Sequence, residues 1–143
     1  MKLSEKGLDL IKKYEGLRLK AYKCPAGLWT IGYGSTFGVR EGMEITEKQA
    51  EDMLWRDVHV AEVCVNGAVT VPLSQGEFDA LVSFCHNLGC GKFRGSTLLR
   101  VLNDGRYDEA ANQLLRWTRG GGRELAGLVA RRQAEKERFE EAA

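Results

Sequence analysis

Three residues near the start of the chain carry side chains that could act together in an acid-assisted reaction. Glu15 supplies a carboxyl group, Cys24 a thiol and Thr30 a hydroxyl. Glu15 lies between Tyr14 and Leu17, and partial shielding from water favours the protonated form of a carboxyl. A protonated carboxyl can act as a general acid. Most glutamates are ordinary surface residues, so this pattern alone does not decide between the two roles.

The elements predicted around these residues are a helix and a hairpin. Ser4 as N-cap and apolar residues at helical spacing predict a helix that ends at Gly16. Alternating residues predict a strand over 17–24, and a turn then leads to a return strand over 28–34. Such a hairpin can bring the thiol and the hydroxyl near the carboxyl at the end of the helix.

The rest of the chain is predicted to be helical. Capping boxes at Thr46 and Ser74 open helices that end near Val65 and at Gly89. Three more segments have helical patterns, over 96–103, 107–117 and 124–141, and the glycine-rich residues 119–123 predict a flexible loop.

These elements predict an α+β fold in one domain, residues 1–143. A small β lobe covers about 16–45, and a larger helical lobe covers about 46–143 together with the N-terminal helix. We expect the ligand to lie in a cleft between the two lobes.

Net charge is +1, yet the charges are unevenly distributed. Residues 1–23 carry seven basic and three acidic side chains, and residues 92–132 carry nine and four. Residues 41–62 carry two basic and seven acidic side chains. The neutral sum argues against a nucleic-acid partner. The basic segments predict either an anion-attracting surface or ordinary solvated helix faces.

Four cysteines, Cys24, Cys64, Cys85 and Cys90, are too few for a disulfide scaffold in a chain of this length. No CxxC pair occurs, and there are only two histidines, His59 and His86. A structural metal site is therefore not expected. No apolar stretch approaches the roughly 20 residues that span a bilayer, and the N-terminus has no apolar signal core.

The chain resembles the phage-type lysozymes of glycoside hydrolase family 24, the endolysins of T-even and lambdoid phages. The family motif is Glu, eight residues, Asp, five residues, Thr, and this chain has Glu15, Cys24 and Thr30 at that spacing. The resemblance covers nearly the whole chain. It continues through 71–75, 78–84, 87–89, 96–99, Trp117, 127–129 and Arg131-Arg132.

The resemblance implies a lysozyme-like fold and cleavage of the β-1,4 bond between N-acetylmuramic acid and N-acetylglucosamine in peptidoglycan. Glu15 would be the general acid, Thr30 would hold the attacking water, and Cys24 would take the place of the usual aspartate. Substrate contacts are expected at Tyr33, Gly34, His86 and Ser96, and no cofactor is expected.

Two positions depart from the family pattern. Cys24 replaces aspartate, and a thiolate can act as base, electrostatic stabiliser or nucleophile, with different stereochemistry. Ser35 stands where the family commonly has histidine, so the hairpin must be held in another way. The family also often has cysteines at the positions of Cys64 and Cys90, which suggests a disulfide with Cys85 buried and Cys24 free; four reduced thiols is the alternative.

Three other functions remain open from the sequence. Cys24 could mark a peptidoglycan-binding module without activity, and a lytic transglycosylase would use the same fold group and substrate. A cysteine hydrolase using Cys24 with His59 or His86 lacks a supporting motif.

The resemblance also implies a place of action. The protein would be a monomer without a membrane anchor, made in the cytoplasm of a bacterial host and acting on the wall in the periplasm. It would either wait for a holin to open the inner membrane or have lost a signal-anchor segment.

Overall fold

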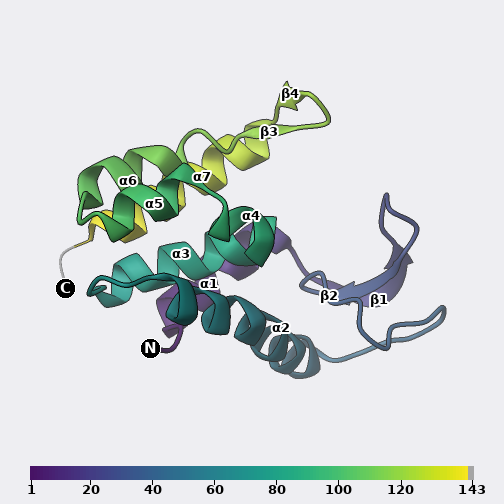
Figure 1. Cartoon of the computed structure of the whole chain (residues 1–143). Helices are drawn as coiled ribbons and strands as arrows, with labels where there is room; N and C mark the ends of the chain where they lie inside the picture. Colours follow the sequence, from purple (N-terminus) through teal and green to yellow (C-terminus); the bar gives the residue numbers. More distant parts are fainter. Residues whose placement is uncertain (142–143) are drawn as a thin grey trace.

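The structure is a computed structural model that describes residues 1–141. One buried helix, α3, forms the centre of the helical lobe, and the β1–β2 hairpin projects from one side (Figure 1). The elements in chain order are α1 (Glu5–Glu15), β1 (Arg18–Lys23), β2 (Trp29–Gly32), α2 (Glu47–Ala68), α3 (Gln75–Leu88), α4 (Cys90–Arg94), α5 (Thr97–Asn103), α6 (Tyr107–Leu114), β3 (Arg119–Gly120), β4 (Arg123–Glu124) and α7 (Ala126–Glu140).

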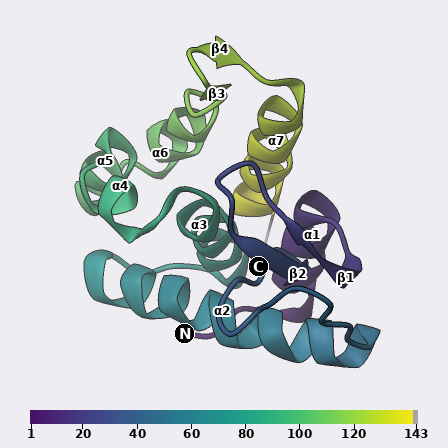
Figure 2. The ribbon, with the colours of Figure 1, turned by 90° about the vertical axis from the view of Figure 1, so that its right-hand side faces the viewer.

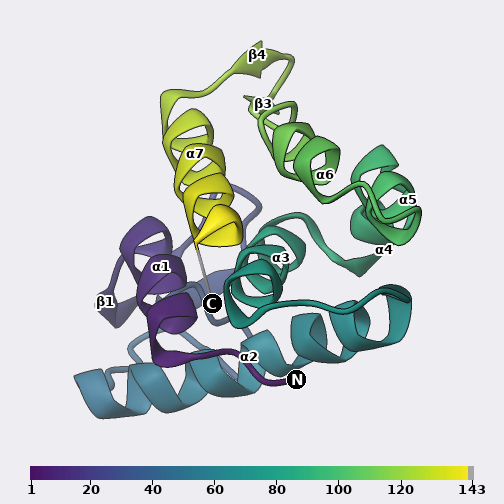
Figure 3. The same ribbon diagram turned by 90° about the vertical axis from the view of Figure 1, so that its left-hand side faces the viewer.

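Helix α3 is buried on nearly every side because α1, α2, α4 and α7 all pack around it. Phe78, Leu81 and Phe84 are fully buried, and Trp117 packs edge-on against the Phe84 ring at 5.7 Å. Burial of side chains of this size contributes roughly 1.5–3 kcal/mol each. Figure 3 shows α1 and α7 side by side along α3, so the two ends of the chain close over the same core.

The β1–β2 hairpin is antiparallel and has a third short partner. Tyr22 pairs with Thr30, and Lys23 pairs with Trp29. The segment before α2 joins the other edge of β1, because Ala21 N–H donates to Met43 O at 2.9 Å and Ile45 N–H donates to Leu19 O. Most of β1 is exposed, whereas Thr30, Ile31 and Gly32 of β2 are buried, so both backbone pairing and the burial of β2 hold this lobe in place.

Ser35 provides the link between the hairpin and the helical lobe. Its hydroxyl donates to Asp57 Oδ2 on α2 at 2.6 Å, and Ser35 is only 1% exposed. Its backbone also pairs with Ile31 in both directions at 2.9 Å. A serine–aspartate hydrogen bond therefore holds the lobe at the position where the family commonly has histidine.

The α+β class and the principal helices are confirmed, whereas three local predictions were wrong. Residues 119–123 are not a flexible loop, because β3 and β4 pair as a small hairpin that Leu125 N–H closes onto Thr118 O at 2.9 Å. The helix predicted to reach residue 117 ends at Leu114 in a series of tight turns, and the closing helix begins at Ala126. Helix α4 was not predicted.

A buried carboxylate joins three helices on the side of α3 away from the hairpin. Asp79 accepts hydrogen bonds from Ser4 N–H at 3.0 Å and from Arg138 Nη2 at 2.7 Å. Nearby, a Cβ on Gly76 would lie 2.4 Å from the Arg138 carbonyl oxygen. Glycine is therefore required there for α3 and α7 to approach so closely.

We expect Ser35→Ala to lower the free energy of unfolding by ~2 kcal/mol, because the buried Ser35 hydroxyl would no longer donate its hydrogen bond to the Asp57 carboxylate. Urea unfolding monitored by circular dichroism measures the change. Thr36→Ala, at the neighbouring exposed position, is the control. Equal stability of the two variants would mean that Ser35 does not anchor the hairpin.

Candidate active site

Glu15, the last residue of α1, is held by an arginine from the opposite end of the chain. Its Oε1 accepts a hydrogen bond from Arg131 Nη1 on α7 at 2.7 Å. The Glu15 side chain is 22% exposed, whereas that of Arg131 is only 4% exposed. The carboxyl therefore reaches the surface while its partner fixes its orientation from inside.

Gly34 leaves room beside this carboxyl. A Cβ at residue 34 would lie 3.3 Å from Glu15 Oε2, and the backbone φ of +90° is one that side-chain-bearing residues rarely adopt. The chain thus needs glycine where it turns past the acid. Gly34 is exposed, so it keeps one face of the Glu15 carboxyl open to an incoming molecule.

Cys24 and Thr30 lie together at the end of the β1–β2 hairpin. The Cys24 backbone N–H donates to Leu28 O at 2.9 Å, and the Thr30 hydroxyl donates to the same carbonyl at 3.0 Å. Thr30 is buried, while Cys24 is half-buried and free. Within residues 1–141 no hydrogen bond joins this pair to Glu15, so convergence of the three groups on one ligand stays a prediction.

The surroundings of Cys24 favour its thiolate form. A backbone hydrogen bond from Leu28 holds the pKa of the Cys24 thiol below its ordinary value, and a further backbone hydrogen bond from Ala26 acts in the same direction. Partial burial opposes them without cancelling them. Cys24 is therefore ionised at lower pH than an ordinary thiol, which increases its negative charge near neutral pH.

His86 of α3 lies close enough to Glu15 for the two side chains to interact electrostatically. Burial lowers the pKa of His86, Arg131 adds to this effect, and the Glu15 and Asp57 carboxylates oppose it. The imidazole is thus favoured in its neutral form. A hollow of about 140 Å³ borders its other side, lined among others by Asp57, Ala61 and Gly89.

The remaining predicted site residues take different positions. Tyr33 is buried in the core, with Lys12 Nζ 5.6 Å from its ring centre, so it supports the site from beneath. Ser96 acts as the N-cap of α5: its hydroxyl donates to Phe93 O at 2.7 Å and accepts from Leu99 N–H. Substrate contact by Ser96 stays a prediction. His59 pairs with Glu62 on α2.

Sequence reasoning missed the buried polar network behind Glu15. Glu135 on α7 is fully buried and accepts hydrogen bonds from Ser83 Oγ at 2.6 Å and from Arg131 Nε at 3.3 Å. Arg132 Nη1 also donates to Glu135. The four-residue spacing of Arg131 and Glu135 indicates a helical ion pair. Such pairs are usually solvated, so the spacing gave no sign of burial.

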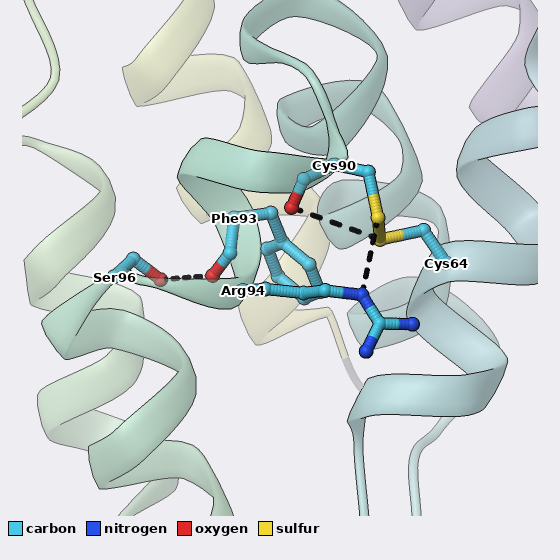
Figure 4. Close-up of a disulfide and its surroundings, with 5 residues drawn as sticks. All are labelled: Cys64, Cys90, Phe93, Arg94 and Ser96. Carbon is cyan, nitrogen blue, oxygen red and sulfur yellow. Dashed lines mark hydrogen bonds between the residues drawn. A yellow bond between two sulfur atoms is a disulfide. The ribbon is translucent and has the colours of Figure 1, made fainter.

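Cys64 and Cys90 form a disulfide between α2 and the start of α4, with an S–S distance of 2.05 Å (Figure 4). Arg94 Nε lies 3.3 Å from Cys90 Sγ beside it. Cys85 is free and buried, and burial raises the pKa of its thiol to about 11. The four cysteines thus differ in chemistry: two are joined, one is protonated and shielded, and Cys24 borders the candidate site.

Comparison with known proteins agrees with this geometry. The family model described as phage lysozyme matches residues 12–135, which include Glu15, Cys24, Thr30 and Arg131. The chain belongs to the phage lysozyme family. Phage lysozymes are muramidases, a class of glycosidase, so this chain is such an enzyme. An endolysin of Acyrthosiphon pisum secondary endosymbiont phage 1 is 47% identical over 99% of this chain and 100% of its own length.

Solved structures of a muramidase domain and of a phage endolysin are also similar to this phage lysozyme. The muramidase domain of SpmX from Asticaccaulis excentricus superposes with a TM-score of 0.94 at 44% identity, and the match covers 99% of both chains. The active form of the P1 phage endolysin Lyz gives 0.87 at 30% identity over 97% of this chain and 85% of its own, and its secreted inactive form gives 0.62. The similarity to solved structures confirms the lysozyme-like fold.

None of the helices within residues 1–141 is long and apolar enough to cross a membrane. The same residues contain no cluster of three or more His, Cys, Asp or Glu side chains that could hold a metal ion.

We expect two free thiols in the denatured, unreduced protein and one fast-reacting thiol in the folded protein. Cys24 should react with iodoacetamide at lower pH than a model thiol because its pKa is lowered, while buried Cys85 should stay unreactive. Thiol titration and mass mapping of the alkylated residues measure both expectations. Four thiols after denaturation would contradict the Cys64–Cys90 disulfide.

Proposed function

We propose that this phage lysozyme hydrolyses the β-1,4 bond between N-acetylmuramic acid and N-acetylglucosamine of peptidoglycan, with Glu15 as general acid. One observation carries this proposal. Glu15 stands at the family's acid position, held by Arg131 at 2.7 Å, with one face of its carboxyl left open by Gly34. An oriented, solvent-reaching carboxyl of this kind suits proton donation to a leaving glycosidic oxygen.

Thr30 and Cys24 would act at the opposite side of the bond. Glycosidases usually flank the reacting carbon with two groups, one to donate a proton and one to deal with positive charge or water. The Thr30 hydroxyl donates to Leu28 O, so its oxygen can still accept a hydrogen bond from a water molecule. Cys24, with its lowered pKa, supplies negative charge where the family has aspartate.

The role of the thiolate determines the stereochemical outcome. As a base or electrostatic stabiliser, Cys24 leaves water as the attacking group, and the anomeric configuration inverts. As a nucleophile it forms a covalent intermediate, and the configuration is retained. We favour inversion, because the backbone hydrogen bonds from Leu28 and Ala26 stabilise the thiolate and thereby reduce its nucleophilicity.

The charge distribution suits an anionic wall polymer. Peptidoglycan carries carboxylates on its lactyl and peptide groups, and both hairpins present exposed cations, among them Lys23 on β1 and Arg119 and Arg123 on β3–β4. Both hairpins project from the same side of the molecule (Figure 2). Gly34 and His86 are the substrate-contacting residues that this proposal retains, and no cofactor takes part.

The biological setting follows from the family. The chain is an endolysin-type lysozyme that acts on the host cell wall during lysis. We propose that it works as a monomeric single domain and reaches the periplasm by a holin-dependent route after synthesis in the host cytoplasm. The Cys64–Cys90 bond suits an oxidising compartment of that kind.

We expect Glu15→Gln to reduce wall lysis about a thousand-fold. The glutamine amide has nearly the size of the carboxyl, but it cannot donate a proton to the leaving oxygen as a general acid. Turbidity loss of bacterial walls measures the rate, and mass spectrometry of the digest identifies the ends produced. Reducing sugar ends support hydrolysis, whereas anhydromuramic ends would identify a lytic transglycosylase. Wall binding without sugar release by the unmodified protein would identify a binding module.

Glu5→Gln is the matched control for this experiment, since it makes the same chemical change at an exposed position of the same helix. It should retain full activity. Full activity of Glu15→Gln itself would reject the assignment of the acid.

Replacement of Cys24 separates a charged role from a structural one. We expect Cys24→Asp to retain substantial activity, because it restores the family's carboxylate, and Cys24→Ala to lose at least tenfold. Both rates are compared at pH 7 with thermal melts of the same samples. Equal activity of the two variants would show that negative charge at this position is not needed.

A further inference from the structure

A small hollow lies between helices α2 and α3. Its volume is about 140 Å³. Val60, Ala61 and Cys85 give it apolar walls, and Asp57 and His86 supply its polar groups. Pockets that enclose a whole small-molecule ligand usually measure about 300–1,000 Å³. The hollow therefore has the size to take one substituent of a larger molecule and not the whole molecule.

Two connections place this hollow next to the Glu15 carboxyl. His86 lines the hollow and lies close enough to Glu15 and to Asp57 to interact electrostatically with both. The backbone makes the second connection, because a Cβ on Gly34 would lie 3.3 Å from Glu15 Oε2. The next residue, Ser35, donates to Asp57 at 2.6 Å. A ligand that reaches Glu15 past Gly34 therefore lies beside the hollow.

The polar groups of the hollow have atoms left for a ligand. Asp57 accepts from Ser35 through Oδ2, and within residues 1–141 no protein donor meets its Oδ1. In the same part of the chain neither ring nitrogen of His86 has a hydrogen-bond partner, and no buried side-chain nitrogen or oxygen is unpaired. These atoms therefore reach solvent. The hollow offers an acceptor at Asp57 and, from a neutral imidazole, a donor at His86.

The rim of the hollow is apolar although it faces water. Among the large apolar side chains of residues 1–141, Phe37 and Val60 are the most exposed, at 80% and 70%. The Arg56 guanidinium carbon lies 5.8 Å from the centre of the Phe37 ring, and Arg56 precedes Val60 by one helical turn on α2. Exposed apolar surface around a pocket is typical of a ligand-binding groove. This rim suits the C–H face of a sugar ring.

An acetamido group matches the hollow in each of its parts. Its methyl group would contact the apolar walls at Val60 and Ala61. Its amide N–H would donate to Asp57 Oδ1, and its carbonyl oxygen would accept from the His86 imidazole. Both amino sugars of peptidoglycan carry such a group. The lactyl and peptide carboxylates of the polymer fit less well, because the Asp57 carboxylate would repel them.

We propose that this hollow is a subsite that binds the acetamido group of an amino sugar while the neighbouring glycosidic bond lies at Glu15. The subsite selects N-acetylated sugars, because an acyl group that cannot enter leaves the polar groups of Asp57 and His86 without their partners. It also fixes the position of the glycan along the site. This inference rests on the proposed hydrolysis of peptidoglycan.

The test uses bacterial walls that are N-deacetylated and then re-acylated with either acetyl or bulky trimethylacetyl groups. The two preparations share the same chemical treatment, keep the amide N–H and differ in the size of the acyl group. We expect the unmodified protein to have about tenfold lower kcat/KM on the trimethylacetyl walls, since the larger group cannot enter the hollow. Equal kcat/KM on both preparations would overturn the proposal.

Val60→Phe places a larger ring at the exposed mouth of the hollow. It should lower kcat/KM about tenfold on the acetyl walls and leave it unchanged on the trimethylacetyl walls, whose acyl groups stay outside. Val63→Phe is the matched control, because Val63 is an exposed valine of the same helix that does not line the hollow. An equal loss on both preparations, or an equal loss in the control, would reject the subsite.

The polar side of the hollow gives a second measurement that needs only the acetyl walls. His86→Phe removes the N–H donor and should raise KM about tenfold with a smaller change in kcat. His86→Gln keeps an N–H donor and should stay within about threefold of the unmodified protein. An unchanged KM in His86→Phe, or an equal rise in both variants, would contradict the assigned contact.

These results separate the inference from the function on which it rests. If the unmodified protein releases no reducing ends from the acetyl walls, the proposed hydrolysis fails and the subsite fails with it. If it releases reducing ends but has equal kcat/KM on the two preparations, only the subsite is removed. Full activity of Glu15→Gln would remove the proposed acid and leave the comparison of acyl groups valid.

Discussion

The structure depends on how it neutralises charge inside the helical lobe. Helix α3 is surrounded by other helices, and α7 brings three arginines against it, Arg131, Arg132 and Arg138. An unpaired charge there would cost several kcal/mol. Each guanidinium therefore has a carboxylate partner, and within residues 1–141 no buried side-chain nitrogen or oxygen lacks a hydrogen bond.

That requirement links stability to the candidate chemistry. One of the three arginines reaches past the core to Glu15, so the residue that neutralises the interior also orients the acid. The hairpin that carries Cys24 and Thr30 is built differently, with a largely exposed β1, a buried β2 and a hydroxyl–carboxylate anchor at Ser35. The candidate site thus combines a carboxyl oriented by an ion pair with a half-buried thiol and a buried hydroxyl.

Much of the fold could be predicted from local signals. Ser4, Thr46 and Ser74 all accept the capping hydrogen bonds expected of them, and the antiparallel hairpin forms where alternation and a turn predicted it. These features depend on residues a few positions apart. The pairing of β3 with β4 was missed, because the glycines at 120–122 indicated a flexible backbone. The pairing involves the residues at the two ends of this glycine run, where Arg119 pairs with Glu124 and Gly120 pairs with Arg123.

The site was predictable in part for the same reason. The motif of Glu15, Cys24 and Thr30 is local and could be matched to a family, whereas Arg131 lies 116 residues from the carboxyl it orients. No periodicity shows that Arg131 and Glu135 are buried, because ion pairs at helical spacing usually face water. Ser96 illustrates a related limit: a serine before a helix serves equally as a cap or as a ligand contact, and the structure shows the cap of α5.

The hydrogen bond between Glu15 of α1 and Arg131 of α7 has a consequence for the order in which the site forms during synthesis on the ribosome. Glu15, Cys24, Thr30 and Gly34 all emerge early and can begin to fold among themselves. Arg131 and its partner Glu135 emerge only after every other element of the site has been synthesised. A nascent or C-terminally truncated chain would therefore carry Glu15, Cys24 and Thr30 with the Glu15 carboxyl unheld, and that carboxyl would be oriented only when α7 docks.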